Sequence, residues 1–355
     1  MVTNQIKVSI AVPAEAEPSV VVGLYDAFWA VGVLWNRIMG EPERPRFNPE
    51  LIGMTLDPIA TSTGIRIAPH RTFAERAAAD IVIIPTLLIG SGREFGRKNP
   101  AVIDWVRQAH EAGSQIVSAC TGSFLLAEAG LLDNRDATTH WAFVDLMKSE
   151  YPSIRVHPDR VLVSATGDGR IVTAGGAASW IDLVLYLAGK FAGPKETMQL
   201  AKIQMFDWHH NGQTPYLRLT TRPQTGDRLI HDCQEWLADH YAGADPVKEM
   251  IRQSGLSRRT FGRRFQSATG HAPLEYVQRV RIEEAKQLLE TGDRTIEHVA
   301  AEVGYSDAVS FRRLFKRMVG ETPAAYRRRL SVSDTARALL RQPLHSEQAG
   351  PPILA

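Results

Sequence analysis

A segment of twenty residues in the C-terminal third of this chain occurs twice, at a fixed offset of 50 residues. Residues 257–276 return as residues 307–326, with aromatic, glycine and proline residues at the same positions. The matched pairs are Phe261 and Phe311, Phe265 and Phe315, Gly270 and Gly320, Pro273 and Pro323, and Tyr276 and Tyr326. Such a repeat indicates two copies of one supersecondary unit. Both copies are rich in arginine, so they predict two matched surfaces for a periodic, acidic partner, of which duplex DNA is the obvious candidate.

Each copy also completes a helix-turn-helix pattern. A capping residue opens the first helix, a glycine marks the turn, and a second capping residue opens the helix that follows. These three residues are Asp245, Gly255 and Ser257 in the first copy, and Thr295, Gly304 and Asp307 in the second. Two helices joined by a short turn with glycine are typical of DNA-binding proteins.

The second helix of each copy has a buried face and a basic face. Phenylalanines four residues apart share the buried face. The opposite face has Arg259, Gly262, Arg263 and Gln266 in the first copy, and Val309, Arg312, Arg313 and Lys316 in the second. Arg263 and Arg313 occupy equivalent positions, and each can pair with guanine, for about 1–3 kcal/mol of discrimination. The alternative is that these arginines meet only phosphates or water. Gly262 either allows a close approach to DNA or is simply tolerated in mid-helix.

A long helix is predicted between the two copies, over residues 274–290. Its seventeen residues span roughly 25 Å at 1.5 Å per residue. With its flanking turns, such a helix can hold two recognition helices about 34 Å apart, which is one turn of duplex DNA. The pattern therefore predicts that both helices enter adjacent major grooves on one face of the DNA.

Charge and cysteine content fit this interpretation. Residues 246–330 contain 17 Lys or Arg and 10 Asp or Glu, a net charge of +7, whereas the remainder contains 24 and 29, a net charge of −5. A basic module joined to a mildly acidic one is typical of a DNA-binding unit attached to a sensor; chance clustering on the surface is the alternative. Two cysteines argue against a disulfide framework. With no secretory signal and no long apolar run, a cytoplasmic location is expected and no membrane partner.

Residues 245–329 resemble the AraC/XylS-type DNA-binding domain of transcription regulators. The motifs that carry the resemblance are Gly304-Tyr305-Ser306-Asp307, Phe315-Lys316-Arg317 and Gly320-Glu321-Thr322-Pro323. The resemblance implies promoter DNA and RNA polymerase as partners, and a homodimer. It also implies a groove-facing set of Arg259, Gly262, Arg263, Ala308, Val309, Arg312 and Arg313.

The first ~190 residues alternate strand-like and helix-like patterns, as in a parallel sheet wrapped by helices. Short β-branched or apolar runs at residues 6–12, 79–85, 115–119 and 171–174 predict strands buried in such a sheet. We therefore expect an α/β fold followed by an all-α domain with two helix-turn-helix motifs. The predicted boundaries are a first domain at 1–206, a polar linker at 207–226, a helical domain at 227–330 and a disordered tail at 331–355.

Cys120 lies where a predicted buried strand meets a helix, between small residues. This is the sequence context of a nucleophile elbow. A thiol at the start of a helix is expected to ionise more readily, because the helix dipole favours the thiolate. His140, twenty residues later, is a candidate partner. An inert, buried cysteine is the alternative.

Residues 6–193 resemble the glutamine-amidotransferase-like (PfpI) superfamily, in the version that is fused to AraC-type domains. Segments 119–127, 137–141 and 171–176 carry the resemblance, in that order and spacing, and the linker segment Gln213-Thr214-Pro215-Tyr216 also resembles that fused class. It implies a flavodoxin-like sandwich. Enzymes of this superfamily pair the elbow cysteine with an acidic residue, but Val20 stands about where that acid is expected. We therefore interpret the pocket as a binding cavity without catalysis, with five candidate lining residues: Cys120, His140, Gly175, Gly176 and Asp26.

Together these patterns predict a sequence-specific transcription regulator that responds to a small molecule. The resemblance suggests a nitrogenous effector such as an amino acid or a betaine. The sequence predicts no cofactor and no metal site; the histidines at 209, 210 and 231 form no convincing metal set and are interpreted as linker and surface residues. Two alternatives stay open: a cysteine hydrolase or amidotransferase with an accessory helical domain, and a regulator whose first domain serves only for assembly.

Overall fold

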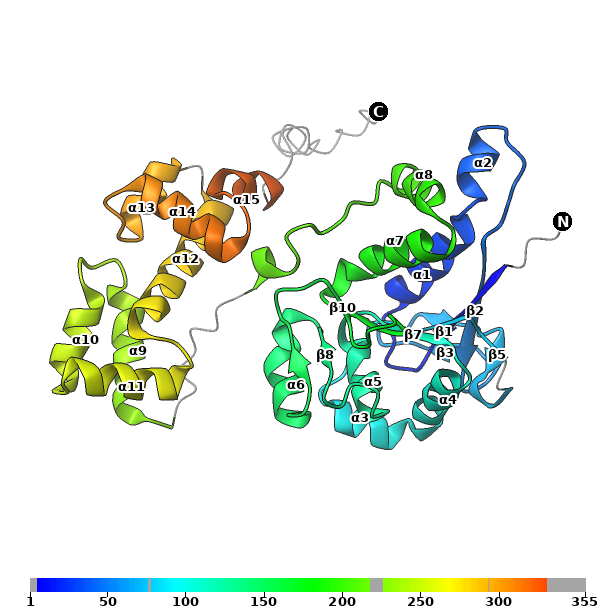
Figure 1. Cartoon of the computed structure of the whole chain (residues 1–355), viewed down its shortest axis with the longest axis horizontal. Coiled ribbons are helices and arrows are strands. Elements are labelled where there is room, and N and C mark those ends of the chain that lie inside the picture. The colour runs from blue at the N-terminus through cyan, green and yellow to red at the C-terminus, as the bar shows by residue number, and fades with distance from the viewer. Residues whose placement is uncertain (1–4, 76–77, 218–225, 293, 331–355) are drawn as a thin grey trace, which may run out of the picture. The chain divides into compact units, whose positions relative to one another are not determined.

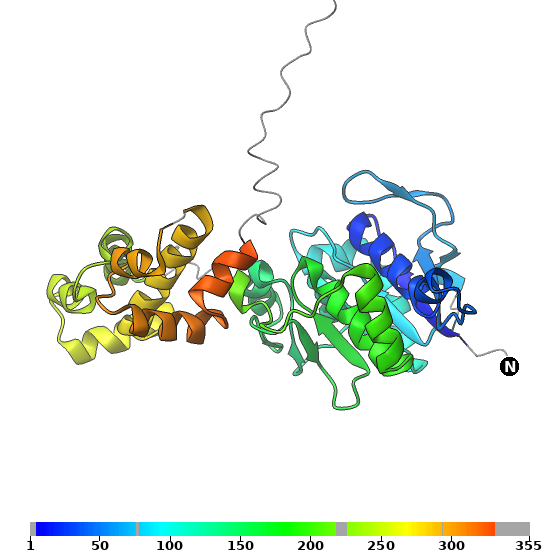
Figure 2. The ribbon, with the colours of Figure 1, turned by 90° about the horizontal axis from the view of Figure 1, so that it is seen from above.

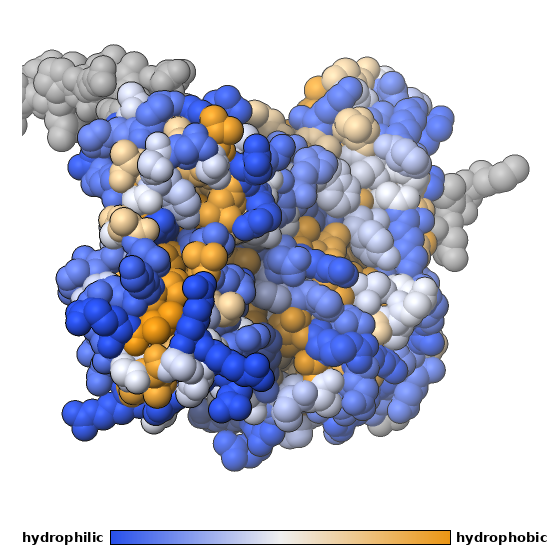
Figure 3. Space-filling view, turned by 60° about the vertical axis from the view of Figure 1, so that its left-hand side comes forward, coloured by the Kyte–Doolittle hydropathy of each residue, from blue (hydrophilic) through white to orange (hydrophobic). Residues whose placement is uncertain are grey.

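The computed structural model describes residues 5–75, 78–217, 226–292 and 294–330 (Figure 1). The chain folds into two compact units, Met1–Leu217 and Arg218–Ala355. Within the described ranges, no helix is both long enough and apolar enough to cross a membrane. The predicted tail at 331–355 lies outside the described residues. In Figure 3 the face in view is mostly hydrophilic, and hydrophobic side chains form patches between the charged ones.

A seven-stranded, mostly parallel sheet forms the centre of the first unit. Its strand order is β10-β11-β7-β6-β1-β2-β5, and only the edge strand β10 is antiparallel to its neighbour. The strands are β1 (Ile6–Ala11), β2 (Phe47–Gly53), β5 (Arg71–Thr72), β6 (Ile81–Ile84), β7 (Gln115–Ser118), β10 (Leu162–Ser164) and β11 (Ile171–Ala174). Every residue of β6, β7 and β11 is buried, as expected for strands covered on both faces.

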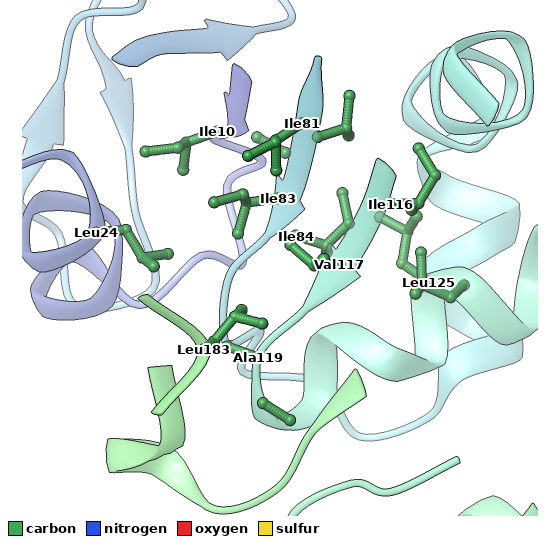
Figure 4. Close-up of a cluster of buried hydrophobic side chains, with 14 of the residues drawn as sticks. Ile10, Leu24, Ile81, Ile83, Ile84, Ile116, Val117, Ala119, Leu125 and Leu183 are labelled. Carbon is green, nitrogen blue, oxygen red and sulfur yellow. The ribbon is translucent and has the colours of Figure 1, made fainter. Parts of the chain in front are cut away.

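Helices cover both faces of this sheet. Figures 1 and 2 show α1, α7 and α8 on one side, and Figure 1 shows α3 to α6 on the other. Their bounds are α1 (Pro18–Ala30), α2 (Leu34–Ile38), α3 (Gly92–Lys98), α4 (Pro100–Glu111), α5 (Ser123–Glu128), α6 (Val144–Glu150), α7 (Trp180–Phe191) and α8 (Pro194–Gln204). Aliphatic side chains fill both interfaces, with Ile83 and Leu24 on the first side and Ile116 and Leu125 on the second (Figure 4). This three-layer α/β architecture confirms the predicted fold class.

Seven helices make up the described part of the second unit. They are α9 (Arg228–His240), α10 (Pro246–Ser254), α11 (Arg258–Thr269), α12 (Pro273–Thr291), α13 (Ile296–Glu302), α14 (Ala308–Val319) and α15 (Pro323–Leu330). The predicted long helix at 274–290 is α12. Its first half packs in one hydrophobic cluster with α11, and its second half packs in another with α14. The two helix-turn-helix units thus have separate cores joined by one helix.

Among the parts of the first unit that were not expected from the sequence, three bear on the sheet and on the site. β2 contains Pro49 and Glu50, so it has no continuous apolar run, yet it pairs in parallel with β1 along its length. α8 was not predicted. Residues 207–217, predicted as the first half of a linker, pack on the first unit instead and contain a short 3-10 helix, Thr214–Tyr216. We call residues 207–217 the strap.

Candidate functional site

The two recognition helices of the repeat have the same length and the same boundaries. α11 and α14 contain twelve residues each and are offset by 50. Ser257 Oγ accepts a hydrogen bond from Thr260 N, and the Asp307 carboxylate accepts from both Val309 N and Ser310 N. A glycine with positive φ ends each helix, Gly270 at 77° and Gly320 at 86°. These caps satisfy backbone groups that a helix end leaves unpaired.

Aromatic packing fixes both helices in the same way. Phe265 meets Tyr276 edge-on with ring centroids 5.3 Å apart, and Phe315 meets Tyr326 edge-on at 5.5 Å. The four phenylalanines of the repeat are fully buried: Phe261, Phe265, Phe311 and Phe315. With these side chains inward, the opposite face of each helix must point to solvent.

The solvent-facing residues are those that the sequence assigned to DNA. Arg259, Arg263, Gln266, Val309, Arg312, Arg313 and Lys316 are exposed, and Gly262 and Ala308 are half-buried. Within the described residues, Arg259, Arg263, Arg313 and Lys316 form no salt bridge, whereas Arg312 is paired with Glu297 of α13. A beta carbon added at Gly262 would meet nothing within 4 Å, so this face is open at its centre.

Arg281 of α12 connects the two helix-turn-helix units. Its guanidinium donates to Tyr241 O at 2.8 Å and to Gly243 O at 2.6 Å, both in the loop before α10. It also donates to Gly304 O at 3.0 Å, in the turn between α13 and α14. The side chain is buried and lies over the Tyr305 ring. One residue therefore ties the loop before α10 and the turn of the second helix-turn-helix to the connecting helix.

In the first unit, Cys120 has the backbone of a nucleophile elbow but not the ionisation expected of one. It follows β7 with φ 55°, a rare conformation for a residue with a side chain. Burial raises the pKa of the Cys120 thiol to about 11, and the negative charge of Glu17 acts in the same direction. The expected net lowering of the thiol pKa is therefore wrong, because burial outweighs the hydrogen bonds from Thr121 and Thr86 that favour the thiolate. Glu17 was not a predicted neighbour, since sequence comparison placed Val20 at the acidic position.

A cavity of about 180 Å³ lies at the start of the helical run that leads into α7. Eleven residues line it: His140, Trp141, Val161, Gly176, Ala177, Ala178, Ser179, His209, Gly212, Gln213 and Tyr216. His140 Nδ1 accepts from Ala142 N at 3.1 Å, which leaves the ring proton on Nε2. Burial lowers the pKa of His140, so its imidazole is uncharged at neutral pH. The cavity has mostly small and aromatic walls with a few polar groups, which is typical of small-molecule sites.

The strap forms one wall of the cavity and is held there by polar contacts. His209 donates its backbone N–H to Asp182 Oδ1 at 2.9 Å, and its Nδ1 lies 2.6 Å from Asp182 Oδ2. The Gln213 amide nitrogen donates to Thr139 O at 2.9 Å, and its oxygen accepts from Trp141 N at 3.1 Å. The interpretation of His209 as a surface residue is therefore wrong, whereas His210 is exposed as expected.

Comparison with known proteins matches both units to families. Residues 25–189 match the DJ-1/PfpI family, and residues 250–329 match a helix-turn-helix domain. The chain is 26% identical over 273 residues to the HTH-type transcriptional regulator CdhR of Pseudomonas aeruginosa, covering 75% of this chain and 77% of that protein. The chain is a helix-turn-helix transcriptional regulator with an N-terminal DJ-1/PfpI domain.

Two further relatives show how much of the chain resembles regulators and how much resembles an enzyme. The HTH-type transcriptional regulator GlxA of Rhizobium meliloti is 26% identical over 230 residues, covering 63% of this chain and 68% of that protein. An isonitrile hydratase of Pseudomonas putida is 33% identical over 163 residues, covering 45% of this chain and 66% of that protein. The likeness to an enzyme is thus partial, whereas the likeness to regulators extends over both units.

The cavity of this regulator contains only part of the predicted lining. His140 and Gly176 face it. Gly175 lies behind the Gln213 side chain, whose amide nitrogen is 2.3 Å from where a beta carbon would stand. Cys120 is buried outside the lining, and Asp26 is exposed on α1. The strap residues were missed because their sequence is polar; the signal in it was the segment Gln213-Thr214-Pro215-Tyr216, which already resembled the fused regulators.

Proposed function

We propose that this cytoplasmic regulator binds promoter DNA through α11 and α14, which enter adjacent major grooves, and that a small effector in the cavity between His140 and the strap controls it. The observation that carries the DNA part is the pair of equivalent helices, each with a basic, solvent-facing side. The groove-facing set remains Arg259, Gly262, Arg263, Gln266, Ala308, Val309, Arg312, Arg313 and Lys316. A homodimer that contacts RNA polymerase is part of the proposal.

The walls of the cavity support an effector site. Its volume of about 180 Å³ slightly exceeds that of an engineered cavity of roughly 150 Å³ that holds benzene. A compact effector fits this size, and an amino acid or a betaine is in that range. The lining that we propose is His140, Trp141, Gly176, His209, Gln213 and Tyr216.

Selection from a random duplex library tests the DNA part. The full-length protein is expected to enrich two sequence motifs at a separation of one helical turn, about 10–10.5 base pairs. Enrichment of no motif would exclude sequence-specific recognition. Binding that depends on salt but not on sequence would mean that the arginines contact phosphates alone.

A thermal-shift screen against a metabolite panel tests the effector part. A compound that binds the folded protein at a concentration of 100 Kd raises stability by about 2.7 kcal/mol. Ala177→Phe fills the cavity, so it is expected to abolish the shift for a true occupant while leaving the unliganded Tm close to that of wild type. A compound that shifts both proteins equally binds elsewhere. A broad panel without any hit favours a domain that serves only for assembly.

The enzyme alternative is tested through the thiol. With a pKa of about 11, Cys120 is protonated at neutral pH, because the thiolate fraction falls tenfold for each pH unit below the pKa. In a Cys233→Ala background, we expect iodoacetamide labelling of Cys120 to rise about tenfold per pH unit between pH 8 and pH 10. A labelling rate that is already constant at pH 8 would indicate a reactive thiolate and favour cysteine catalysis.

A further inference from the structure

We propose that the strap transmits the state of the cavity to the DNA-binding unit. An occupant of the cavity holds the strap on the first unit and so shortens the chain segment that connects the two units, which we call the tether. This inference rests on the effector function proposed above and adds how the signal leaves the site. The strap, residues 207–217, is the last part of the first unit along the chain.

The cavity has two walls of different origin. Trp141 and Gly176 belong to the α/β body, whereas His209, Gln213 and Tyr216 belong to the strap. A molecule in the cavity therefore touches both the body and the strap. Four of the eleven lining residues belong to the strap. A molecule in the cavity loses its contacts with them when the strap leaves, so it binds the docked state more tightly and shifts the equilibrium towards that state.

The first attachment of the strap is His209 on Asp182. The Asp182 side chain, in the first turn of α7, is only 1% exposed. It accepts from both the backbone N–H and the ring of His209. A buried carboxylate needs such partners, because an unpaired charge away from water is costly. Docking of the strap thus satisfies a charge that the body cannot pair in this way by itself.

The second attachment is a socket for Gln213. The side chain is 3% exposed, and its amide nitrogen lies within hydrogen-bond distance of Thr138 Oγ1, Thr139 O and Arg160 O. Gly212, with φ 59°, lets the chain enter this socket: a beta carbon there would lie 2.1 Å from Asp159 O. Only a residue without a side chain therefore fits at position 212 when the strap is docked.

The strap is held by these polar contacts more than by apolar burial. Only Pro215 of its hydrophobic residues is buried, and Trp208 and Tyr216 are each 39% exposed. Segments with few buried apolar contacts open at a small free-energy cost. Docking is thus expected to be reversible, and the contacts of a small occupant are enough to change it.

Release of the strap lengthens the connection between the units. With the strap docked, residues 218–226 connect Leu217 to the cap of α9 at Asp227. With the strap released, eleven further residues join the connection, which adds up to about 36–40 Å of reach. The range of separations open to the DNA-binding unit therefore differs between the two states.

Hydrogen exchange and distance measurement on the full-length protein test this inference. His209→Ala removes the ring contact with Asp182, and Gln213→Met removes the socket contacts at similar volume. Loss of a hydrogen bond to a charged group costs about 1.5–3 kcal/mol, so exchange of the strap amides in His209→Ala is expected to rise roughly ten- to a hundredfold. His210→Ala is the matched control, since the neighbouring imidazole is exposed.

Spin labels at Glu111→Cys and Lys248→Cys, one in each unit, report the distance between the units; both native cysteines are replaced, Cys120→Ser and Cys233→Ala, so that only the introduced thiols react. We expect a broader distance distribution in His209→Ala and Gln213→Met than in wild type and His210→Ala. Each compound that raises Tm in the metabolite panel should slow strap exchange in the wild type. Unchanged exchange in both variants, or faster exchange with an unchanged distance distribution, would overturn the inference, as would a compound in the cavity that leaves strap exchange unaltered. A metabolite panel without a hit counts against the proposed effector. The distance distributions of His209→Ala and Gln213→Met still decide whether the strap controls the length of the tether.

Discussion

The two helix-turn-helix units share one framework but present different surfaces. Both have capped recognition helices, a buried phenylalanine pair and an edge-on contact between phenylalanine and tyrosine. On the solvent side, however, the first unit has Gly262 where the second has Arg312, and only the second has an arginine tied to the preceding helix. The repeat therefore preserves residues that position the helix and varies residues on the side that we propose faces DNA. Two half-sites of different sequence are expected.

The interiors of the two helix-turn-helix units also differ in the hydrogen-bond partners of Tyr276 and Tyr326. The Tyr276 hydroxyl accepts from the Gln234 amide at 2.8 Å, whereas the Tyr326 hydroxyl donates to the Glu290 carboxylate. Burial raises the pKa of both tyrosines, and the neighbouring carboxylate raises that of Tyr326 further. The same packing position thus tolerates a neutral or a charged partner, because each provides a hydrogen bond to the hydroxyl of a buried tyrosine.

The largest expected effect on stability comes from replacing Arg281, which connects the two helix-turn-helix units. Arg281→Met leaves three backbone carbonyls without a guanidinium, at a cost of roughly 3–5 kcal/mol in the free energy of unfolding. Library selection should then return both motifs with a relaxed separation, whereas Arg279→Met, on the exposed side of the same helix, should keep the wild-type separation. A fixed separation in Arg281→Met would mean that packing alone orients the units.

Equivalent turn glycines should differ in their tolerance of alanine. Gly255 and Gly304 both have positive φ, which costs about 1–2 kcal/mol for other residues. A beta carbon at Gly255 meets nothing within 4 Å, but at Gly304 it lies 2.5 Å from Ala242 O. Urea unfolding should therefore show a loss at Gly304→Ala that exceeds the loss at Gly255→Ala by about 1–3 kcal/mol. Equal losses would indicate that the second turn can shift.

Substitutions in the two recognition helices should affect different half-sites of the DNA. Arg263→Ala is expected to relax selection in one half-site and Arg313→Ala in the other, each by about 1–3 kcal/mol of discrimination. Competition titrations with duplexes altered in one half-site at a time measure this. If either variant loses the same affinity for every duplex, its arginine contacts only phosphate.

The smallest expected effect is that of Gly262→Ala, which should change protein stability and DNA affinity in opposite directions. Gly262→Ala should stabilise the free protein by about 0.5–1 kcal/mol, because α11 gains a better helix former and the new methyl group meets open space. If DNA approaches the backbone closely there, the same change weakens specific binding. Thermal unfolding and DNA titration of one preparation give both signs. Unchanged DNA affinity would make Gly262 merely tolerated.

Most of the helical unit followed from the sequence, because its signals are local. Caps at Ser257 and Asp307, turn glycines and aromatic spacing act within a few residues, so the pattern predicts both helix ends and the buried face. Arg281 was not predicted, since its three partners lie 23 to 40 residues away. An arginine in the middle of a basic segment looks like a DNA contact until its burial is known.

The cavity of the first unit was less predictable for the same reason. Periodicity identified the central strands, and the elbow at Cys120 followed from a strand that meets a helix between small residues. The state of the thiol depends on burial, which sequence spacing does not report. The contacts of His209 and Gln213 span 27 and up to 75 residues, so a polar segment that looks like a linker is in fact a wall.

The carboxylate of Asp182 has a practical consequence for the folding autonomy of the first unit. A fragment that stops at residue 206 would place this acid at the start of α7 without the imidazole and amide of His209. It would also leave an open polar trough where Gln213 belongs. A fragment of the first unit should therefore end after Leu217. A shorter fragment is expected to be less stable because it lacks the contacts of His209 and Gln213, whatever its response to a small molecule.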